Sequence, residues 1–183
     1  MSVPKAACEE AARILGCDVA AIQAVAEVES GGRTNCKAFL FEPHWFSRLT
    51  NRAFDRTHSS VSYPKWDKSK YPKGQARLDQ FRKACDLDRD KAHQSASWGL
   101  FQIMGFHFAK CDYASAEEMA QGFQASVENN VTGFTKFIQA SGWADDLRLH
   151  RWAQFARKYN GPAYAKNQYD KKLAAAHERY RKA

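Results

Sequence analysis

The 183-residue sequence contains no run of apolar residues long enough to cross a bilayer, and it has no internal repeats or low-complexity tracts. Its first residues, MSVPKAACEEAARILG, place Glu9 and Glu10 where a secretory signal needs an uninterrupted apolar segment. The length and a hydrophobic content of 44% are sufficient for one domain with a substantial core. We therefore expect a single domain over residues 1–183, made in the cytoplasm without a signal peptide.

The sequence also lacks the spacing motifs of common metal and nucleotide sites. Its five cysteines are widely spread, and neither a Cys-X-X-Cys pair nor a Cys/His spacing indicates zinc. Reduced, structural thiols are therefore the expectation. There is no nucleophile elbow, phosphate-binding loop, dinucleotide fingerprint or His-Glu-X-X-His motif. We expect neither a metal nor a cofactor.

Positive charge is in excess, with 28 Lys and Arg against 20 Asp and Glu and a formal net charge of +8. Such a surplus favours polyanionic partners, namely nucleic acid, anionic lipid or an anionic cell wall, and its sign alone does not choose among them. Part of it lies on a C-terminal amphipathic helix: Lys166, Lys171, Lys172, Arg179, Arg181 and Lys182. This helix would suit an anionic outer membrane, although an ordinary solvated face is the simpler interpretation.

The most informative stretch is DVAAIQAVAEVESGG, residues 18–32. Read as a helix, it carries one stripe at positions i, i+3, i+4 and i+7: Ile22, Val25, Ala26 and Glu29. Asp18 suits the N-cap, and the glycine pair 31–32 ends the helix. Glu27 points to the opposite face. The pattern therefore predicts that Glu29 faces the core from the last helical turn.

A carboxylate in this position has the properties of a general acid. Desolvation on a core-facing stripe raises its pKa, and the negative end of the helix dipole acts in the same direction. A carboxylic acid that stays protonated near neutral pH can donate a proton to a leaving group. The alternative is a shifted helix phase, with Glu29 solvated at a frayed end, and this stretch alone does not decide between them.

The rest of the chain predicts a mainly α protein, with at most a small β element. Further helices are expected over residues 3–15, 43–49, 75–85, 88–94, from 115 onwards, and over 127–138, 149–159 and 169–180. A short strand is expected at 38–42, and residues 51–73 read as an irregular lobe. In that lobe Tyr63, Trp66 and Tyr71 either pin the loop to the core, the simpler interpretation, or stack on sugar rings or bases.

Four short segments then occur in a defined order: Glu29-Ser30-Gly31-Gly32, FEPHWF at 41–46, Ser97-Trp98-Gly99-Leu100-Phe101-Gln102-Ile103, and Lys158-Tyr159-Asn160-Gly161. The set resembles the lysozyme-like superfamily, in which goose-type lysozymes and soluble lytic transglycosylases have Glu-Ser, then Gly-Leu-Xaa-Gln, then Tyr-Asn-Xaa-Gly. With FEPHWF included, it most closely resembles the N-acetylmuramidase domain of phage endolysins. The resemblance covers nearly the whole chain.

This resemblance implies a lysozyme-like fold and a catalytic module without a separate peptidoglycan-binding module. It implies that Glu29 protonates the β-1,4 bond between N-acetylmuramic acid and N-acetylglucosamine, which breaks through an oxocarbenium-like transition state. It also implies action on peptidoglycan strands in the periplasm or cell wall, after release from the host cytoplasm through a holin or equivalent. We further expect a monomer with no nucleic-acid partner.

The second catalytic group is less well defined. An inverting hydrolase holds a water with a second carboxylate roughly 6.5–9.5 Å from the acid. Glu42 is the first candidate, because an unpaired carboxylate in its apolar segment would be costly; its alternative role is a structural partner for Arg33, Arg48 or a helix N-terminus. Asp55 is a weaker candidate. If no carboxylate is close, the muramyl 6-hydroxyl attacks instead, as in lytic transglycosylases, and leaves an anhydro end.

The resemblance also implies which residues contact the glycan. Gln102 matches the glutamine that lines the saccharide cleft, with a hydrogen bond to the backbone as the alternative. Tyr159 matches the tyrosine near the acid, which orients the acid or contacts sugar; the alternative is a core ring whose hydroxyl is satisfied elsewhere. Asn160 either contacts substrate or caps a turn. Ser97 and His44 complete the candidate binding residues, and His44 would orient Glu42 or simply belong to the core.

Two other classes of function remain open at this point. A basic nucleic-acid-binding module would use the aromatic and basic residues around Trp66 and Tyr71, although no binding motif supports it. A wall-binding protein without activity would share the resemblance but not the chemistry. A nucleic-acid-binding module gives no purpose to a desolvated carboxylate at Glu29.

Overall fold

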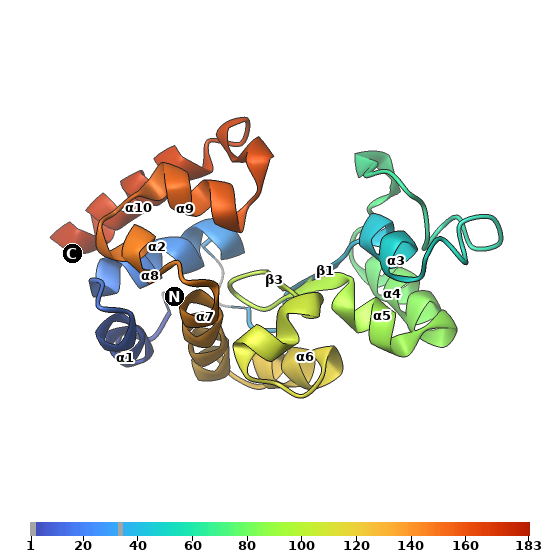
Figure 1. The fold of residues 1–183 in the computed structure, drawn as a ribbon, viewed down its shortest axis with the longest axis horizontal. Coiled ribbons are helices and arrows are strands. Elements are labelled where there is room, and N and C mark those ends of the chain that lie inside the picture. Colours follow the sequence, from blue (N-terminus) through green and yellow to red (C-terminus); the bar gives the residue numbers. More distant parts are fainter. Residues whose placement is uncertain (1–2, 33–34) are drawn as a thin grey trace.

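The computed structural model describes residues 3–32 and 35–183, and its helices form two lobes on either side of a small sheet (Figure 1). One lobe contains α1 (Lys5–Leu15), α2 (Val19–Ser30), α7 (Val127–Ser141), α8 (Ala144–Arg148), α9 (Trp152–Tyr159) and α10 (Tyr169–Lys182). The other contains α3 (Pro43–Leu49), α4 (Gln75–Leu87) and α5 (Arg89–Gln94), and α6 (Ala116–Ala125) lies below the sheet. The predicted mainly α class is confirmed.

Short 3₁₀ helices complete the helical content: η1 (Lys68–Lys70), η2 (Gly105–Cys111) and η3 (Pro162–Ala165). In residues 51–73, η1 is the one regular element, and turns and loops make up the rest. In this segment the Tyr63 ring is buried in the core, whereas Trp66 is 61% exposed to solvent. In the described part of the chain, no helix combines the length and the apolar character that crossing a membrane requires.

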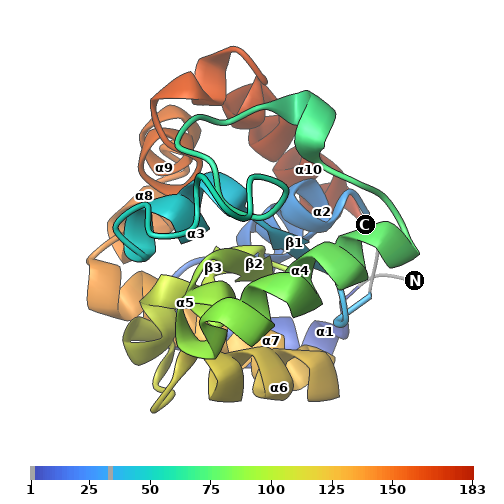
Figure 2. The same cartoon turned by 90° about the vertical axis from the view of Figure 1, so that its right-hand side faces the viewer.

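The sheet is antiparallel, with the order β1 (Phe39–Phe41), β2 (Ala96–Trp98), β3 (Ile103–Met104). The turned view shows it between α2 and α4 (Figure 2). The strand at 38–42 is as predicted, but the β2–β3 hairpin has no sequence counterpart in our expectations. Because β2 has three residues and β3 has two, both are too short for the alternation of polar and apolar residues over about 4–8 positions that predicts a half-buried strand.

The helix carrying Glu29 begins and ends where the sequence predicts. The Asp18 side chain accepts a hydrogen bond from the Ala21 N–H at 2.7 Å, and Gly31 adopts a left-handed conformation with φ of 64° at the C-cap. Ile22 and Val25 are fully buried. Local capping and periodicity together are sufficient to set these boundaries.

The predicted helix over 149–159 is wrong at its start. Leu149 is 54% exposed and lies in a turn between α8 and α9, and His150 in the same turn has a positive φ of 51°. The Arg151 N–H donates to the Asp146 carbonyl and closes this turn. The apolar spacing of Leu149 and Trp152 imitated a helical face, whereas Phe155 and Ala156 carry the buried face of α9.

A buried asparagine fastens the hairpin to the helices behind it. The Asn130 Oδ1 accepts from the Leu100 N–H at 2.8 Å, and its Nδ2 donates to the Phe123 and Ser126 carbonyls. Gly99 packs directly against it, because a Cβ there would lie 1.8 Å from Asn130 Oδ1. The position of the Gly99–Gln102 turn therefore depends on this side chain.

We expect Asn130→Ala to lower the free energy of unfolding by about 2–4 kcal/mol, because the Leu100 N–H and the Phe123 carbonyl lose their buried bonds to this side chain and the Ser126 carbonyl loses one of its two donors. Asn129→Ala is the matched control, since its one side-chain bond, to the Gly122 carbonyl, is exposed and its loss should cost about 1 kcal/mol or less. Denaturant titration of both variants gives the comparison. Equal losses would contradict the role assigned to Asn130.

Candidate active site

Glu29 lies in the last turn of α2 and lines a cavity of about 400 Å³ between the two lobes. The lining comes from four parts of the chain: Glu29 and Ser30 of α2, Asn35, Lys37, Ala38, Phe39 and Leu40, then Gly74 and Arg77, and Gln102 from the hairpin turn. A larger cavity of about 600 Å³, between α4 and residues 59–72, lacks both Glu29 and Gln102. The smaller cavity therefore contains the predicted acid, Glu29.

Burial raises the pKa of Glu29 from its usual 4.5 to about 7. One polar contact opposes this shift, because the Asn160 Nδ2 donates a hydrogen bond to Glu29 Oε1 at 2.8 Å and favours the anion. Asn160 follows α9 directly. The carboxyl group is thus poised between its two protonation states near neutral pH and is fixed in orientation by a neighbouring amide.

Tyr159 precedes Asn160 and anchors it to the hairpin. Its hydroxyl donates to the Phe101 carbonyl at 2.7 Å, and its ring packs against Phe137 and Phe155. Burial and the nearby Glu29 charge raise the pKa of Tyr159 well above its usual value. The hydroxyl is therefore used in a backbone contact, and Tyr159 links the two segments that flank Glu29.

Gln102 lies in the hairpin turn with a positive φ of 49°, an uncommon conformation for a residue with a side chain. Its Oε1 accepts from the Ser97 hydroxyl at 2.9 Å, and its Nε2 donates to the Gly99 carbonyl at 2.8 Å. Both halves of the amide are thus partnered within the turn. The alternative role expected for Gln102, a hydrogen bond to the backbone, is therefore present in the structure, and the Gln102 side chain also lines the cavity.

Glu42 lies in a second polar cluster, at the start of α3. The Tyr71 hydroxyl donates to its Oε2, and His44 Nδ1 lies 3.3 Å from the same oxygen. Burial raises the pKa of Glu42, and it lowers the pKa of His44. Among the described residues, the lining of the Glu29 cavity reaches Leu40 and does not include Glu42.

The alternative partners predicted for Glu42 do not account for its contacts. The Arg48 guanidinium lies 4.5 Å from the centre of the Trp45 ring, and Arg33 lies outside the described residues. Glu42 is the N-cap residue of α3, but its side chain makes no capping hydrogen bond. Asp55 pairs with Arg52 at 3.1 Å and accepts from the Ser62 hydroxyl at 2.6 Å. The sequence reasoning missed Tyr71 as the partner of Glu42.

The sequence reasoning also missed Arg77, which lines the Glu29 cavity. Its guanidinium donates to the Pro72 and Phe39 carbonyls at 3.3 and 3.4 Å, so α4 is tied to β1 beside Glu29. The sequence offered no more than an ordinary basic residue near a helix start. Its proximity to Glu29 arises because α4 packs against β1.

A family model for N-acetylmuramidase matches residues 18–181. The chain belongs to the N-acetylmuramidase family. It is also similar to a solved structure titled as the crystal structure of Burkholderia AP3 phage endolysin, with 32% sequence identity, a TM-score of 0.86, and coverage of 97% of this chain and 70% of that chain. No curated protein sequence matches significantly.

The muramidase is thus a glycoside hydrolase with a lysozyme-like, mainly α fold, and it degrades peptidoglycan. The match begins at Asp18, the N-cap of the helix that carries Glu29, and extends past Asn160. It therefore includes every residue of the cavity described above. The resemblance seen in the sequence is confirmed at the level of the family.

The raised pKa of Glu29 predicts a pH-dependent stability for the muramidase. Since the folded protein holds this proton up to about pH 7 and the unfolded chain loses it near 4.5, the stabilisation is complete below pH 4.5 and is lost as pH rises to 7. The loss amounts to at most about 3 kcal/mol. Denaturant titrations from pH 4 to 8 should show this fall in the wild type, and in Glu29→Gln the fall should be smaller by that amount.

Glu9→Gln, which removes an exposed charge from α1, is the matched control and should keep the wild-type fall because Glu29 remains. A Glu29→Gln variant with an unchanged pH slope would contradict the assignment of the raised pKa to Glu29.

Proposed function

We propose that the muramidase cleaves the β-1,4 bond between N-acetylmuramic acid and N-acetylglucosamine, with Glu29 as the general acid. The observation that carries the proposal is a carboxyl group with a pKa of about 7, in a cavity between the lobes. Near neutral pH a substantial fraction of the protein holds the proton that the reaction needs. Glu29 gives it to the glycosidic oxygen as the bond to the anomeric carbon breaks and an oxocarbenium-like sugar forms.

Asn160 acts as a positioning residue for the acid. Its amide donates to Glu29 Oε1, and this bond strengthens when the carboxyl group loses its proton and becomes an anion. The bond therefore favours the state that proton transfer produces, while burial keeps the proton in place beforehand. Tyr159 supports Asn160 through the Phe101 carbonyl.

Gln102 and Ser97 bind the glycan in this proposal. The Ser97–Gln102 bond fixes the amide at the cavity surface, where it offers its remaining hydrogen-bonding capacity to a sugar hydroxyl or N-acetyl group. Because the turn is rigid and held by Asn130, the amide needs little ordering when the glycan binds.

Glu42 is the proposed second carboxylate. Burial raises its pKa, which makes its anion a stronger base toward water, and the Tyr71 hydroxyl and His44 hold it in place. The extended backbone at 39–42 directs Leu40 and Glu42 to the same side, and Leu40 lines the Glu29 cavity. The alternative is a lytic transglycosylase with the same acid, in which the muramyl 6-hydroxyl replaces water.

We also propose that residues 1–183 act as a single, monomeric catalytic domain that reaches the wall after holin-type release from the host cytoplasm. Contact with an anionic outer membrane through α10 has less support. Three of the six basic residues named for this contact are paired with acids: Arg179 with Glu27, and Arg181 and Lys182 with Glu178. The cell-wall action itself fits the similarity to a phage endolysin.

Glu29→Gln should lower the rate at which a peptidoglycan suspension clears by roughly 10²–10⁴-fold, because the amide cannot donate the proton. Glu27→Gln is the matched control: it lies two residues earlier on the same helix, where it pairs with Arg179 at the surface. It should clear at close to the wild-type rate. Undiminished clearing by Glu29→Gln would refute the acid assignment, and binding to random DNA without clearing would favour the nucleic-acid alternative.

Mass spectrometry of the digested muropeptides should show reducing muramic acid ends if Glu42 activates water, and Glu42→Gln should slow their release by roughly 10²-fold or more. Asp55→Asn tests the weaker carboxylate and should retain activity, because Asp55 is held by Arg52 and Ser62. Anhydro ends, with or without Glu42, would identify the transglycosylase reaction and remove the base role from Glu42.

A further inference from the structure

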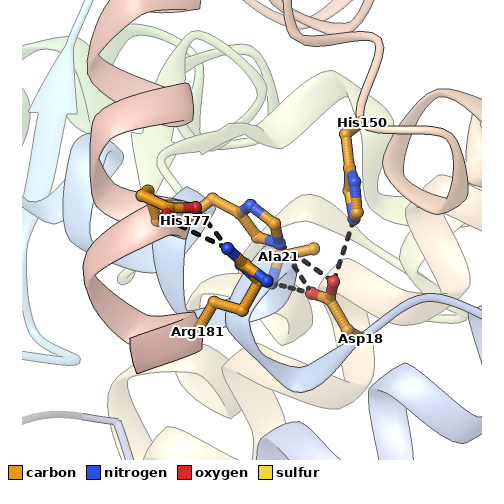
Figure 3. Close-up of polar contacts among 6 residues, drawn as sticks. Asp18, Ala21, His150, His177 and Arg181 are labelled. Carbon is orange, nitrogen blue, oxygen red and sulfur yellow. Dashed lines mark hydrogen bonds and ion pairs between the residues drawn. The ribbon is translucent and has the colours of Figure 1, made fainter. Parts of the chain in front are cut away.

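A second cluster of ionisable side chains lies outside the Glu29 cavity. Asp18 at the N-cap of α2, His150 in the α8–α9 turn and His177 of α10 bring three potential ligand atoms within 4.8 Å of one another (Figure 3). The Asp18 Oδ2 is 2.9 Å from the Nε2 atoms of both histidines. Three segments that are far apart in the sequence thus direct their polar ends to one point.

We propose that Asp18, His150 and His177 bind a divalent transition-metal ion, with Zn²⁺ as the best match. Two imidazole nitrogens and one carboxylate oxygen form a donor set that zinc accepts with a water molecule as fourth ligand. Ca²⁺ and Mg²⁺ prefer all-oxygen sites and fit this set poorly. In this proposal the ion links α2 to the C-terminal segments and takes no part at the Glu29 cavity, whose lining does not include these residues.

The spacing of the donors suits this ion. Metal–ligand bonds of about 2.0–2.1 Å in a tetrahedral site place donor atoms about 3.3 Å apart. The 2.9 Å contacts from Asp18 Oδ2 to the two Nε2 atoms need an expansion of only a few tenths of an ångström, and the two Nε2 atoms lie within 4.8 Å of each other. Meanwhile Asp18 Oδ1 caps α2 through the Ala21 N–H, which leaves Oδ2 for the ion.

The surroundings combine access with rigidity. The side chains of Asp18 and His150 are 41% and 40% exposed, which lets an ion enter, whereas that of His177 is 8% exposed and fixed in the core. The His150 ring stacks on Trp152, which restricts its orientation. The backbone of His150 has a positive φ, an uncommon conformation for a residue with a side chain.

The positive charge of Arg181 could oppose the binding of a cation at this cluster. Arg181 lies beside the cluster on α10 (Figure 3), and its guanidinium is paired with Glu178 through two hydrogen bonds of 3.1 and 3.2 Å. Its charge is therefore partly neutralised locally. An ion bound here would join α2, α10 and the α8–α9 turn, at the end of α2 opposite to Glu29.

The test uses the full chain without an affinity tag, first treated with a chelator and then titrated with Zn²⁺ by calorimetry. We expect one equivalent to bind and the melting temperature to rise by roughly 5–10 °C when free Zn²⁺ exceeds the dissociation constant about 100-fold. Because the five cysteines of the chain could also bind Zn²⁺, Co²⁺ is used as a second probe that distinguishes the ligand types. Its absorption should show nitrogen and oxygen ligands without a thiolate charge-transfer band.

Two variants locate the site. His150→Ala should weaken Zn²⁺ binding at least about tenfold, and His58→Ala, which removes an exposed histidine outside the cluster, should bind like the wild type. Asp18→Asn retains an oxygen for the helix cap but loses the charged ligand, so it should fold and still bind weakly. Wild-type affinity in both His150→Ala and Asp18→Asn, or a thiolate band with Co²⁺, would overturn the proposal.

Discussion

The desolvation of one carboxyl group is the constraint on which the rest of this structure depends. Glu29 ends a helix whose inner stripe is fully buried at Ile22 and Val25, so its position is set by a large amount of apolar packing. The same burial raises its pKa to about 7. A folded state that desolvates this group loses stability as the pH rises toward neutrality, and it keeps a protonated carboxyl group at the cavity between the lobes.

The surrounding elements hold that group without neutralising it. Asn160 supplies a dipole and no charge, and Tyr159 uses its hydroxyl on the Phe101 carbonyl. A lysine or arginine in the place of Asn160 would favour the carboxylate and remove the proton. The aromatic packing around Tyr159 and the buried Asn130 then fix the α9 end and the hairpin turn on either side of the cavity.

Much of this was accessible from local sequence. The cap at Asp18, the apolar stripe and the terminating glycines define the helix within about fifteen residues, and the Ser115 cap of α6 is of the same kind. The sequence-based predictions were wrong or incomplete at two places where the pattern of neighbouring residues does not reflect how the segment packs. Leu149 has helical spacing but is exposed in a turn, and the strands β2 and β3 have only three and two residues, so neither segment carries the periodicity that identifies its true state.

By itself the sequence determined which residue is the acid candidate and which family the chain resembles, because caps, periodicity and short motifs are properties of neighbouring residues. Only the tertiary structure decided what each group touches. Asn160 meets Glu29 across 131 residues of sequence, Tyr71 meets Glu42 across 29, and His177 meets Asp18 across 159. Such contacts arise from the packing of whole helices, and a spacing rule for neighbouring residues contains no information about them.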